Sequence, residues 1–169
     1  LSIYFNKKGN KLVCIGQNSK KISSLKNVLK NRKNIYFSGD LSKDFDLKKL
    51  INNLNKIRNI DTVIHCMGGG LGLKKDLIPK NDFEKLIKVN LLVQSEINNL
   101  IIKNMIKKKL KGKIIHISSI AGVESIASIG YSVAKAALTV YSKKLASLFL
   151  KKNIFIKTLI LGAFETNDN

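Results

Sequence analysis

The sequence predicts an α/β protein with a three-layer, doubly wound parallel sheet, and two patterns carry this prediction. Short runs rich in Ile and Val alternate with longer amphipathic stretches, and the runs lack strict alternation, as expected of strands covered on both faces. The repeated strand–helix–strand order favours parallel strands joined by crossover helices. The expected strands are residues 11–16, 34–39, 61–67, 113–119 and 153–161. The expected helices are residues 19–33, 43–59, 81–110 and 130–152.

Length and composition predict a single globular domain over residues 1–169. The 169 residues are 44% hydrophobic and contain one proline, which is typical of a chain with a packed core. No uncharged apolar run of about 18 residues occurs, so we expect no membrane span and no membrane partner. Gly9 follows "IYFNKK" as a C-cap would, so the first residues are expected to be helical. No signal peptide is visible at Leu1, and the expectation of a cytoplasmic protein comes from the isolated cysteines, which fit a reducing compartment.

The net charge of +20 raises the question of a nucleic-acid partner. Nearly all the excess is lysine, because only Arg32 and Arg58 are arginines, and base readout favours the arginine fork. The lysines are spread over every expected helix, and the densest run, "KKKLKGK" at 107–113, ends a helix, where positive charge is favourable. We therefore expect no nucleic-acid partner, but a surface that weakly attracts anions such as phosphorylated cofactors.

The cysteines and histidines predict neither a disulfide nor a metal site. Cys14 and Cys66 are isolated within apolar runs, so both are expected to be buried thiols in a reducing compartment. His65 and His116 lie in expected strands and lack ligand-like spacing to cysteines or carboxylates.

Small and hydroxyl residues gather where the expected strands end. Because cofactors bind at the carboxyl ends of such sheets, these ends favour a ligand crevice over ordinary loops. The cluster at 68–72 lacks the G-x-G-x-x-G spacing and is interpreted as backbone that lets a flat ligand pass close by. The strand ends are "GQN" 16–18, "GDL" 39–41, "MGGGLG" 67–72, "SSIAG" 118–122 and "LGAFET" 161–166.

Tyr131 and Lys135, in "GYSVAKAAL" 130–138, are four residues apart and share one face of an expected helix. Taken alone, the pair is consistent with two polar residues on a helix surface or with an acid/base and its cationic partner. The ordered set of motifs decides: "GDL", "HCMG", "VNLL", "HISSIAG", "GYSVAKAAL" and "LGAFET" resemble the short-chain dehydrogenases/reductases over nearly all 169 residues. That resemblance implies a Rossmann fold and NAD(P)-dependent interconversion of a carbonyl and an alcohol.

The resemblance also implies catalytic roles. Tyr131 would protonate the substrate carbonyl, and Lys135 would favour its phenolate and hold the nicotinamide ribose. Ser119, matched through "S-x-x-G" to Gly122, would support the developing oxyanion, with Ser118 as the less favoured substitute. Asn90 matches the asparagine at a break in the long helix, where a freed carbonyl would hold a relay water.

For the cofactor, the resemblance matches four strand ends. No carboxylate follows the strand before Gln17, where family members discriminate NAD from NADP, and Lys20 and Lys21 come soon after, which favours NADP over NAD. The matched residues are Gln17 for discrimination, Asp40 and Leu41 at the adenine, Cys66, Met67 and Gly68 along the ribose, and Gly162 and Thr166 at the carboxamide and phosphates.

The chain also departs from the family. "HCMG" replaces Asn-Asn-Ala-Gly, so His65 is expected to take over the first asparagine's structural hydrogen bonds, and "LG" at 161–162 replaces Pro-Gly. The Gly-rich pyrophosphate turn, the first strand and the substrate-covering segment have no match. We therefore expect a fragment of a longer protein, with two central strands left unpaired, whose isolated 169 residues are unstable and bind cofactor poorly.

Two further expectations concern partners. The resemblance implies a homodimer or homotetramer formed through helices 90–110 and 130–150, where Ala134, Ala136 and Ala137 allow close approach or pack on the chain's own sheet. A catalytically silent Rossmann-type scaffold is the alternative function. The substrate is a small carbonyl or alcohol, and a 3-oxoacyl thioester, a sugar and a steroid-like alcohol all remain open.

Overall fold

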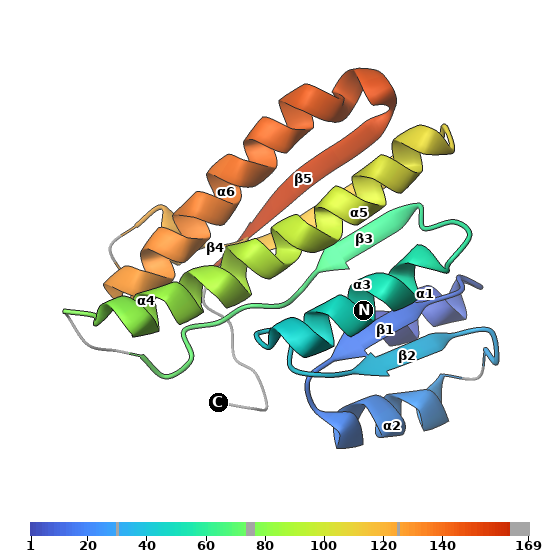
Figure 1. Ribbon diagram of the computed structural model, residues 1–169, viewed down its shortest axis with the longest axis horizontal. Helices are drawn as coiled ribbons and strands as arrows, with labels where there is room; N and C mark the ends of the chain where they lie inside the picture. Colours follow the sequence, from blue (N-terminus) through green and yellow to red (C-terminus); the bar gives the residue numbers. More distant parts are fainter. Residues whose placement is uncertain (30, 74–76, 125, 163–169) are drawn as a thin grey trace. The chain divides into compact units, whose positions relative to one another are not determined.

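The structure, a computed structural model, describes residues 1–29, 31–73, 77–124 and 126–162 (Figure 1). The chain divides into two compact units, Leu1–Leu54 and Asn55–Asn169, and each is described by itself. The expectation of one domain over residues 1–169 stays a prediction.

Unit 1 is a two-stranded parallel sheet with three helices. Strands β1 and β2 pair from Val13↔Ile35 to Gly16↔Ser38. Its elements are α1 (Ser2–Lys7), β1 (Val13–Gly16), α2 (Ser19–Val28), β2 (Ile35–Ser38) and α3 (Asp44–Asn55).

Local signals explain where the helices of unit 1 begin and end. Gly9, with φ of +80°, follows the end of α1, as its position after a helical run predicts. Asn18 caps α2, because its side-chain oxygen accepts a hydrogen bond from the Lys21 N–H at 3.0 Å. Helix α3 begins with Asp44 at its positive end and buries a stripe of Leu47, Leu50 and Leu54, spaced three and four residues apart.

Unit 2 is a three-stranded parallel sheet in the order β3-β4-β5. A long helical segment joins β3 to β4, and a second helix joins β4 to β5. Its elements are β3 (Thr62–His65), α4 (Lys80–Ile87), the π-helical turn η1 (Lys88–Leu92), α5 (Val93–Lys107), β4 (Gly112–Ser119), the 3-10 turn η2 (Ile120–Gly122), α6 (Ile129–Phe149), the 3-10 turn η3 (Leu150–Lys152) and β5 (Ile154–Leu161).

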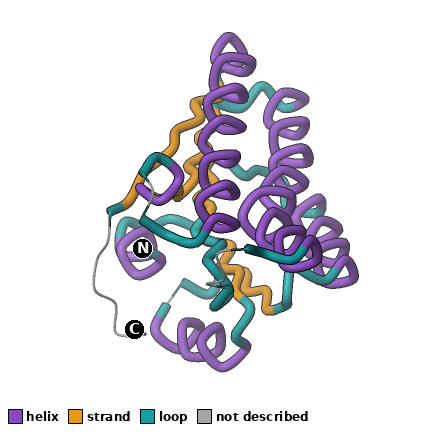
Figure 2. Tube along the Cα trace, turned by 90° about the vertical axis from the view of Figure 1, so that its left-hand side faces the viewer, coloured by secondary structure: helices purple, strands orange, loops and turns teal. Residues whose placement is uncertain are grey.

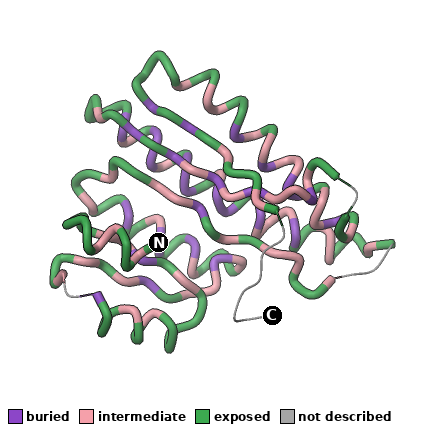
Figure 3. Tube along the Cα trace, turned by 180° about the vertical axis from the view of Figure 1, so that it is seen from behind, coloured by how far each residue is buried: buried purple, intermediate pink, exposed green. Residues whose placement is uncertain are grey.

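Helices α5 and α6 cover one face of this sheet (Figure 1), and the side view in Figure 2 shows the two long helices on the same side of the strands. Buried positions recur every three or four residues along both helices (Figure 3), and they include polar side chains such as Gln94, Asn98 and Lys135 as well as apolar ones. Gly112 lets the end of α5 approach the sheet, since a Cβ there would collide with the Met105 sulfur. The fully buried core includes Leu86, Ile101, Met105, Ile114, Leu138 and Ile154.

The expected α/β class and all five strands are confirmed, and the fold is Rossmann-like with parallel sheets. Strand β3 ends at His65, two residues earlier than expected, and the expected helix 81–110 is interrupted by η1. Within the described residues β1 and β3 each pair on one side only, which confirms the expectation of unpaired strand edges.

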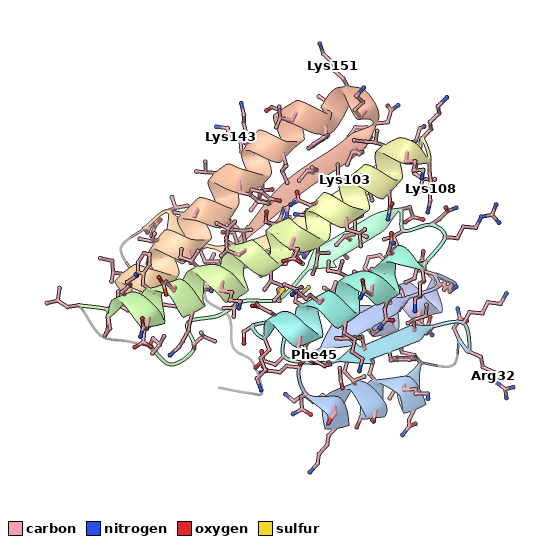
Figure 4. The ribbon with its side chains drawn as sticks, in the orientation of Figure 1. Arg32, Phe45, Lys103, Lys108, Lys143 and Lys151 are labelled. Carbon is pink, nitrogen blue, oxygen red and sulfur yellow. The ribbon has the colours of Figure 1, made fainter. Side chains whose placement is uncertain are left out.

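Of the lysines of unit 2 that are labelled in Figure 4, Lys143 on α6 and Lys151 in η3 point away from the ribbon. Lys108 donates a hydrogen bond to the backbone carbonyl of Arg58. Such exposed cations contribute little to stability. No helix in the described ranges has both the length and the apolar character needed to cross a membrane.

Candidate active site

Tyr131 and Lys135 lie one turn apart at the start of α6. Gly130 brings this end of the helix against α4, because a Cβ there would lie 2.6 Å from Leu86 Cδ1. Lys135 Nζ lies 5.7 Å from the centroid of the Tyr131 ring, within cation–π range. Lys135 is only 4% exposed, whereas Tyr131 is half-buried, so the pair points a shielded cation at a reachable phenol.

Strand β4 holds the buried lysine in place. Lys135 Nζ donates a hydrogen bond to the Ile117 carbonyl at 3.0 Å. Burial lowers the pKa of Lys135, because desolvation penalises its charged form. Gly122 permits this packing, since a Cβ there would lie 2.7 Å from Ala136 N and 2.8 Å from Lys135 C. The glycine of "S-x-x-G" is thus required for the close approach of η2 to α6.

Ser118 and Ser119 end β4 and play different structural parts. Ser118 is buried, and its Oγ lies 2.9 Å from Thr139 Oγ1 and 3.1 Å from the Lys135 carbonyl oxygen. Ser119 is half-buried, and its Oγ accepts a hydrogen bond from Ala121 N–H at 3.2 Å, which caps η2. Because the Ser119 oxygen accepts the capping hydrogen bond, its O–H group can still donate a hydrogen bond to another acceptor.

Asn90 lies at the centre of the π-helical turn η1, so the expected break in the long helix is present. The residue is fully buried. Its Nδ2 donates to the carbonyls of Leu86 and Gly69, both at 3.0 Å, while its Oδ1 accepts from Gly69 N–H at 3.0 Å. Asn90 therefore fixes the loop after β3 through both backbone groups of one residue.

Gly68 brings this loop against the lysine. A Cβ at Gly68 would collide with Asn90 Oδ1 and lie 3.2 Å from Lys135 Nζ, and the backbone there has φ of +127°. At Gly69 and Gly70 a Cβ would meet no atom within 4 Å. Only glycine suits position 68, and the loop leaves open space beside the next two residues.

One sequence-based expectation for this loop is wrong. Cys66 was expected to be buried, but it is exposed, because β3 ends at His65 and Cys66 already belongs to the loop; Cys14 is buried as expected. Met67 is half-buried, and its carbonyl accepts a hydrogen bond from Gln94 Nε2 at 3.3 Å. The Asn90 carbonyl accepts from the same Gln94 nitrogen at 2.9 Å, and its expected role of holding a relay water stays a prediction.

A second buried polar group lies beneath α5 and involves both histidines. His65 Nε2 lies 2.8 Å from Asn98 Oδ1, Asn98 Nδ2 lies 2.9 Å from His116 Nε2, and His116 Nδ1 lies 2.9 Å from Ser142 Oγ. The two rings stack with centroids 5.0 Å apart. Burial lowers the pKa of His65 to about 4 and that of His116 to about 3, so both are neutral near pH 7. His65 thus makes structural hydrogen bonds, as its place in "HCMG" predicts.

In unit 1 the structure brings Gln17 and Asp40 together at the carboxyl ends of β1 and β2. The Asp40 carboxylate accepts hydrogen bonds from Ser42 Oγ at 2.7 Å and Ser42 N–H at 3.1 Å. The hydrogen bond from the Ser42 hydroxyl, with smaller help from Lys43 and Gln17, lowers the pKa of Asp40. Leu41 is buried beside it. This end of unit 1 carries a fixed carboxylate next to a side-chain amide.

The remaining expected residues lie at the end of the described chain. Gly162 is exposed and directly follows β5. Thr166 lies outside the described residues. Within the described ranges no group of three or more His, Cys, Asp or Glu side chains is arranged to hold a metal ion.

Gln94 and Asn98 were missed from the sequence. Together with Asn90 they place an amide at every fourth position, which puts all three on one face of a helix. That spacing is a signal in the sequence, but the chain contains many asparagines, so the spacing alone does not separate buried amides from solvated ones.

Comparison with known proteins identifies the family. The short chain dehydrogenase family model matches residues 1–169. The chain belongs to the short-chain dehydrogenase family. It is 28% identical over 163 residues to the 3-oxoacyl-[acyl-carrier-protein] reductase FabG of Rickettsia prowazekii, covering 96% of this chain and 66% of the relative. The chain thus spans about two thirds of the length of the curated relatives it matches.

Solved short-chain dehydrogenases share the fold. A bulky-bulky ketone specific alcohol dehydrogenase from Comamonas testosteroni superposes with a TM-score of 0.89 at 19% identity, covering 98% of this chain and 68% of that one. A short-chain dehydrogenase from Sphingobium yanoikuyae in complex with NADPH gives 0.88 at 18% identity, with 97% and 65% covered. A 4-hydroxyisoleucine dehydrogenase complexed with NADH and succinate gives 0.77 at 25% identity, with 95% and 72% covered.

Proposed function

We propose that the protein containing this chain is an NAD(P)-dependent oxidoreductase that interconverts a carbonyl and an alcohol. The observation that carries the proposal is the buried ammonium of Lys135, held 5.7 Å from the Tyr131 ring centroid and next to Gly68. A buried cation beside a reachable phenol is costly for stability and suited to moving a proton. Family membership and the NADPH- and NADH-bound neighbours support a nicotinamide cofactor.

The loop after β3 is suited to a flat cofactor. Gly68 has no side chain to block Lys135, and open space adjoins Gly69 and Gly70. In unit 2 the residues that would hold the cofactor are Tyr131, Lys135, Cys66, Met67, Gly68 and Gly162, with Thr166 beyond the described chain. In unit 1 they are Gln17, Asp40 and Leu41. When bound, the nicotinamide supplies or takes up the hydride.

The residues of the chain then have separate tasks. Tyr131 donates its phenolic proton to the substrate oxygen during reduction, and the adjacent positive charge of Lys135 stabilises the phenolate that remains. Ser119 donates a hydrogen bond to the same oxygen and keeps its proton, since its own oxygen already caps η2. Ser118 is committed to Thr139 and the backbone of α6, which favours Ser119 for this role. Asn90 holds the loop in place.

Replacement of Tyr131 tests the proposal. In the whole protein, Tyr131→Phe is expected to lower turnover by roughly 10²- to 10⁴-fold while cofactor binding survives, because only the transferable proton is lost. Tyr141→Phe, on the same helix, is the matched control and keeps turnover. Assays begin with a 3-oxoacyl thioester, the substrate class in the name of the Rickettsia relative. Unchanged turnover of Tyr131→Phe would reject the role, and cofactor binding without any turnover in the wild type would favour the scaffold alternative.

For the cofactor we propose NADP rather than NAD. Gln17, an uncharged side chain, follows β1, and Lys20 is exposed in the first turn of α2. A 2′-phosphate is attracted by positive charge, whereas an NAD ribose is usually held by a carboxylate there. Fluorescence titration of the whole protein should give a lower Kd for NADPH than for NADH, and Lys20→Glu should reduce the difference. Equal affinities would contradict the preference.

We also propose assembly as a homodimer or homotetramer through residues 90–110 and 130–150. On η1, α5 and α6, apolar side chains remain exposed at Leu92, Ile106, Val133, Val140 and Leu148, whereas Ala134 is buried within its own unit. Such a surface is suited to burial against a second copy. Light scattering should give a multiple of the chain mass for the wild type and the monomer mass for Val140→Glu.

A further inference from the structure

Gln94 lies in the first turn of α5, directly after the π-helical turn, and is fully buried. Its amide nitrogen donates to two backbone carbonyls, that of Asn90 at 2.9 Å and that of Met67 at 3.3 Å. One carbonyl belongs to the opened helical turn and the other to the loop after β3. A single side chain thus joins the two segments that converge next to Lys135.

Asn90 and Gln94 bind the two residues that flank Gly68 in the loop after β3. Asn90 binds both backbone groups of Gly69, and Gln94 binds the carbonyl of Met67. Between these points lies Gly68, whose Cβ position would be 3.2 Å from Lys135 Nζ. The distance between the loop and the lysine is therefore set by two amides, one helical turn apart.

The other end of the Gln94 amide argues against a purely stabilising role. Gln94 Oε1 is buried and has no hydrogen-bond partner within the described residues. An unpaired buried acceptor costs free energy, and a methionine of similar length would avoid that cost. The donor end of the amide is what the site gains from a glutamine at this position.

We propose that Gln94 is a positioning residue of the active site, which ties the loop after β3 to the opened turn of the helix and so fixes Gly68 against Lys135. The inference rests on the proposed function, because it concerns the geometry of that same site. Gln94 touches neither the reacting atoms nor Lys135 in its hydrogen bonds, and it acts through the carbonyls of Asn90 and Met67.

Two replacements separate positioning from packing. In the whole protein, Gln94→Met removes both hydrogen bonds at nearly constant volume. We expect kcat to fall by about 10- to 100-fold, because small misplacements in a site have effects of this size. Amide exchange at Gly68 and Gly69 in the cofactor-free protein should speed up by about tenfold. Asn98→Leu is the matched control, a buried amide one turn further along α5 that contacts His65 and His116 instead; it should lower Tm yet leave kcat and loop exchange within about twofold.

Gln94→Glu provides a second test, which can be carried out even if Gln94→Met folds poorly. A carboxylate facing two carbonyl oxygens is disfavoured, whereas its protonated form can donate one hydrogen bond to Asn90. The ratio of variant kcat to wild-type kcat should therefore rise as pH falls.

The inference would be overturned if Gln94→Met had the same kcat and the same loop amide exchange as the wild type. It would also be overturned if the ratio of Gln94→Glu kcat to wild-type kcat did not change with pH. Absence of turnover in the wild type would instead reject the proposed function, and the exchange comparison would still decide whether Gln94 ties the loop.

Discussion

Two buried polar clusters lie along α5, and they differ in how completely they are paired. The closed cluster, His65, Asn98, His116 and Ser142, bonds side chain to side chain from β3 to α6. The open cluster, Asn90, Gln94 and Lys135, bonds mainly to backbone, and Gln94 Oε1 has no hydrogen-bond partner in the part of the chain that the structure describes. Both are at least nine-tenths buried, so burial alone does not distinguish a structural network from a site.

The difference lies in spare hydrogen-bonding capacity next to open space. Lys135 has three N–H donors, and one of them meets Ile117. The neighbouring Gly69 and Gly70 have no atom within 4 Å of their Cβ positions. In the closed cluster the neutral histidines satisfy their neighbours and offer nothing to a ligand. A satisfied network specifies a core, whereas an incompletely paired one accepts a substrate at some cost in stability.

The largest expected effect is on the open cluster. Lys135→Met in the whole protein should lower kcat by roughly 10²- to 10⁴-fold, because the cation that favours the phenolate is lost. Stability should change little, since the variant also removes a buried charge. Steady-state kinetics and thermal unfolding check both parts. Lys143→Met, an exposed lysine on the same helix, is the control, and retained turnover in Lys135→Met would remove the distinction between the clusters.

Lowering the pH should destabilise the protein through the closed cluster. The folded pKa values of about 4 for His65 and about 3 for His116 lie below the ordinary 6.5, so the unfolded chain binds more protons between these values. The stability contributed by these two neutral histidines is thus fully present above about pH 6.5 and is lost as the pH falls below it. Between pH 7 and pH 5 we expect a loss of about 2 kcal/mol for each histidine. Urea unfolding measures it, and His65→Gln should flatten the dependence; equal stabilities at the two pH values would contradict it.

A smaller effect is expected from replacing glycines in the loop after β3, where Gly68 and Gly70 have different surroundings. Gly68→Ala should lower stability by about 1–3 kcal/mol and raise the KM for cofactor, because its methyl group meets Asn90 Oδ1 at an unfavourable φ. Gly70→Ala, which has open space and no positive φ, is the control and should change both quantities little. Equal effects of the two replacements would mean that the loop is not held against Asn90.

The smallest effect concerns the two serines. Ser118→Ala should cost about 1 kcal/mol of stability with little change in kcat, because its hydroxyl is bound to Thr139 and α6. Ser119→Ala should also cost about 1 kcal/mol, because its hydroxyl caps η2, but unlike Ser118→Ala it should lower kcat. Denaturant unfolding and kinetics of both variants separate the roles, and the reverse pattern would assign the substrate oxygen to Ser118.

Much of the fold could be predicted from the sequence, because local patterns determine it. Short apolar runs marked each of the five strands, and Gly9 marked the end of the first helix. Asn18, which caps α2, could have been used in the same way. The positions of Tyr131 and Lys135 on one helical turn followed from their spacing alone. The end of β3 at His65 did not, because the apolar Cys66 and Met67 continue the run while the following glycines release the chain.

The buried amides could not be predicted, because their meaning depends on contacts distant in sequence. Gln94 contacts Met67 across 27 residues, and Asn98 contacts His116 across 18. In a chain rich in asparagine and lysine, a polar residue in a helix is usually solvated. Only the packed structure distinguishes Gln94 and Asn98 from the exposed Asn99 beside them.

The π-helical turn at Lys88–Leu92 also determines how α5, which follows it, is rotated about its own axis. Each residue of an α-helix turns the chain by about 100°, so deleting one residue here would rotate Asn98 by that angle relative to Phe83. The amide that joins His65 to His116 would then face a different neighbour. Chain length in this one turn therefore determines which face of α5 meets the sheet, and insertions or deletions there should be tolerated far less than substitutions.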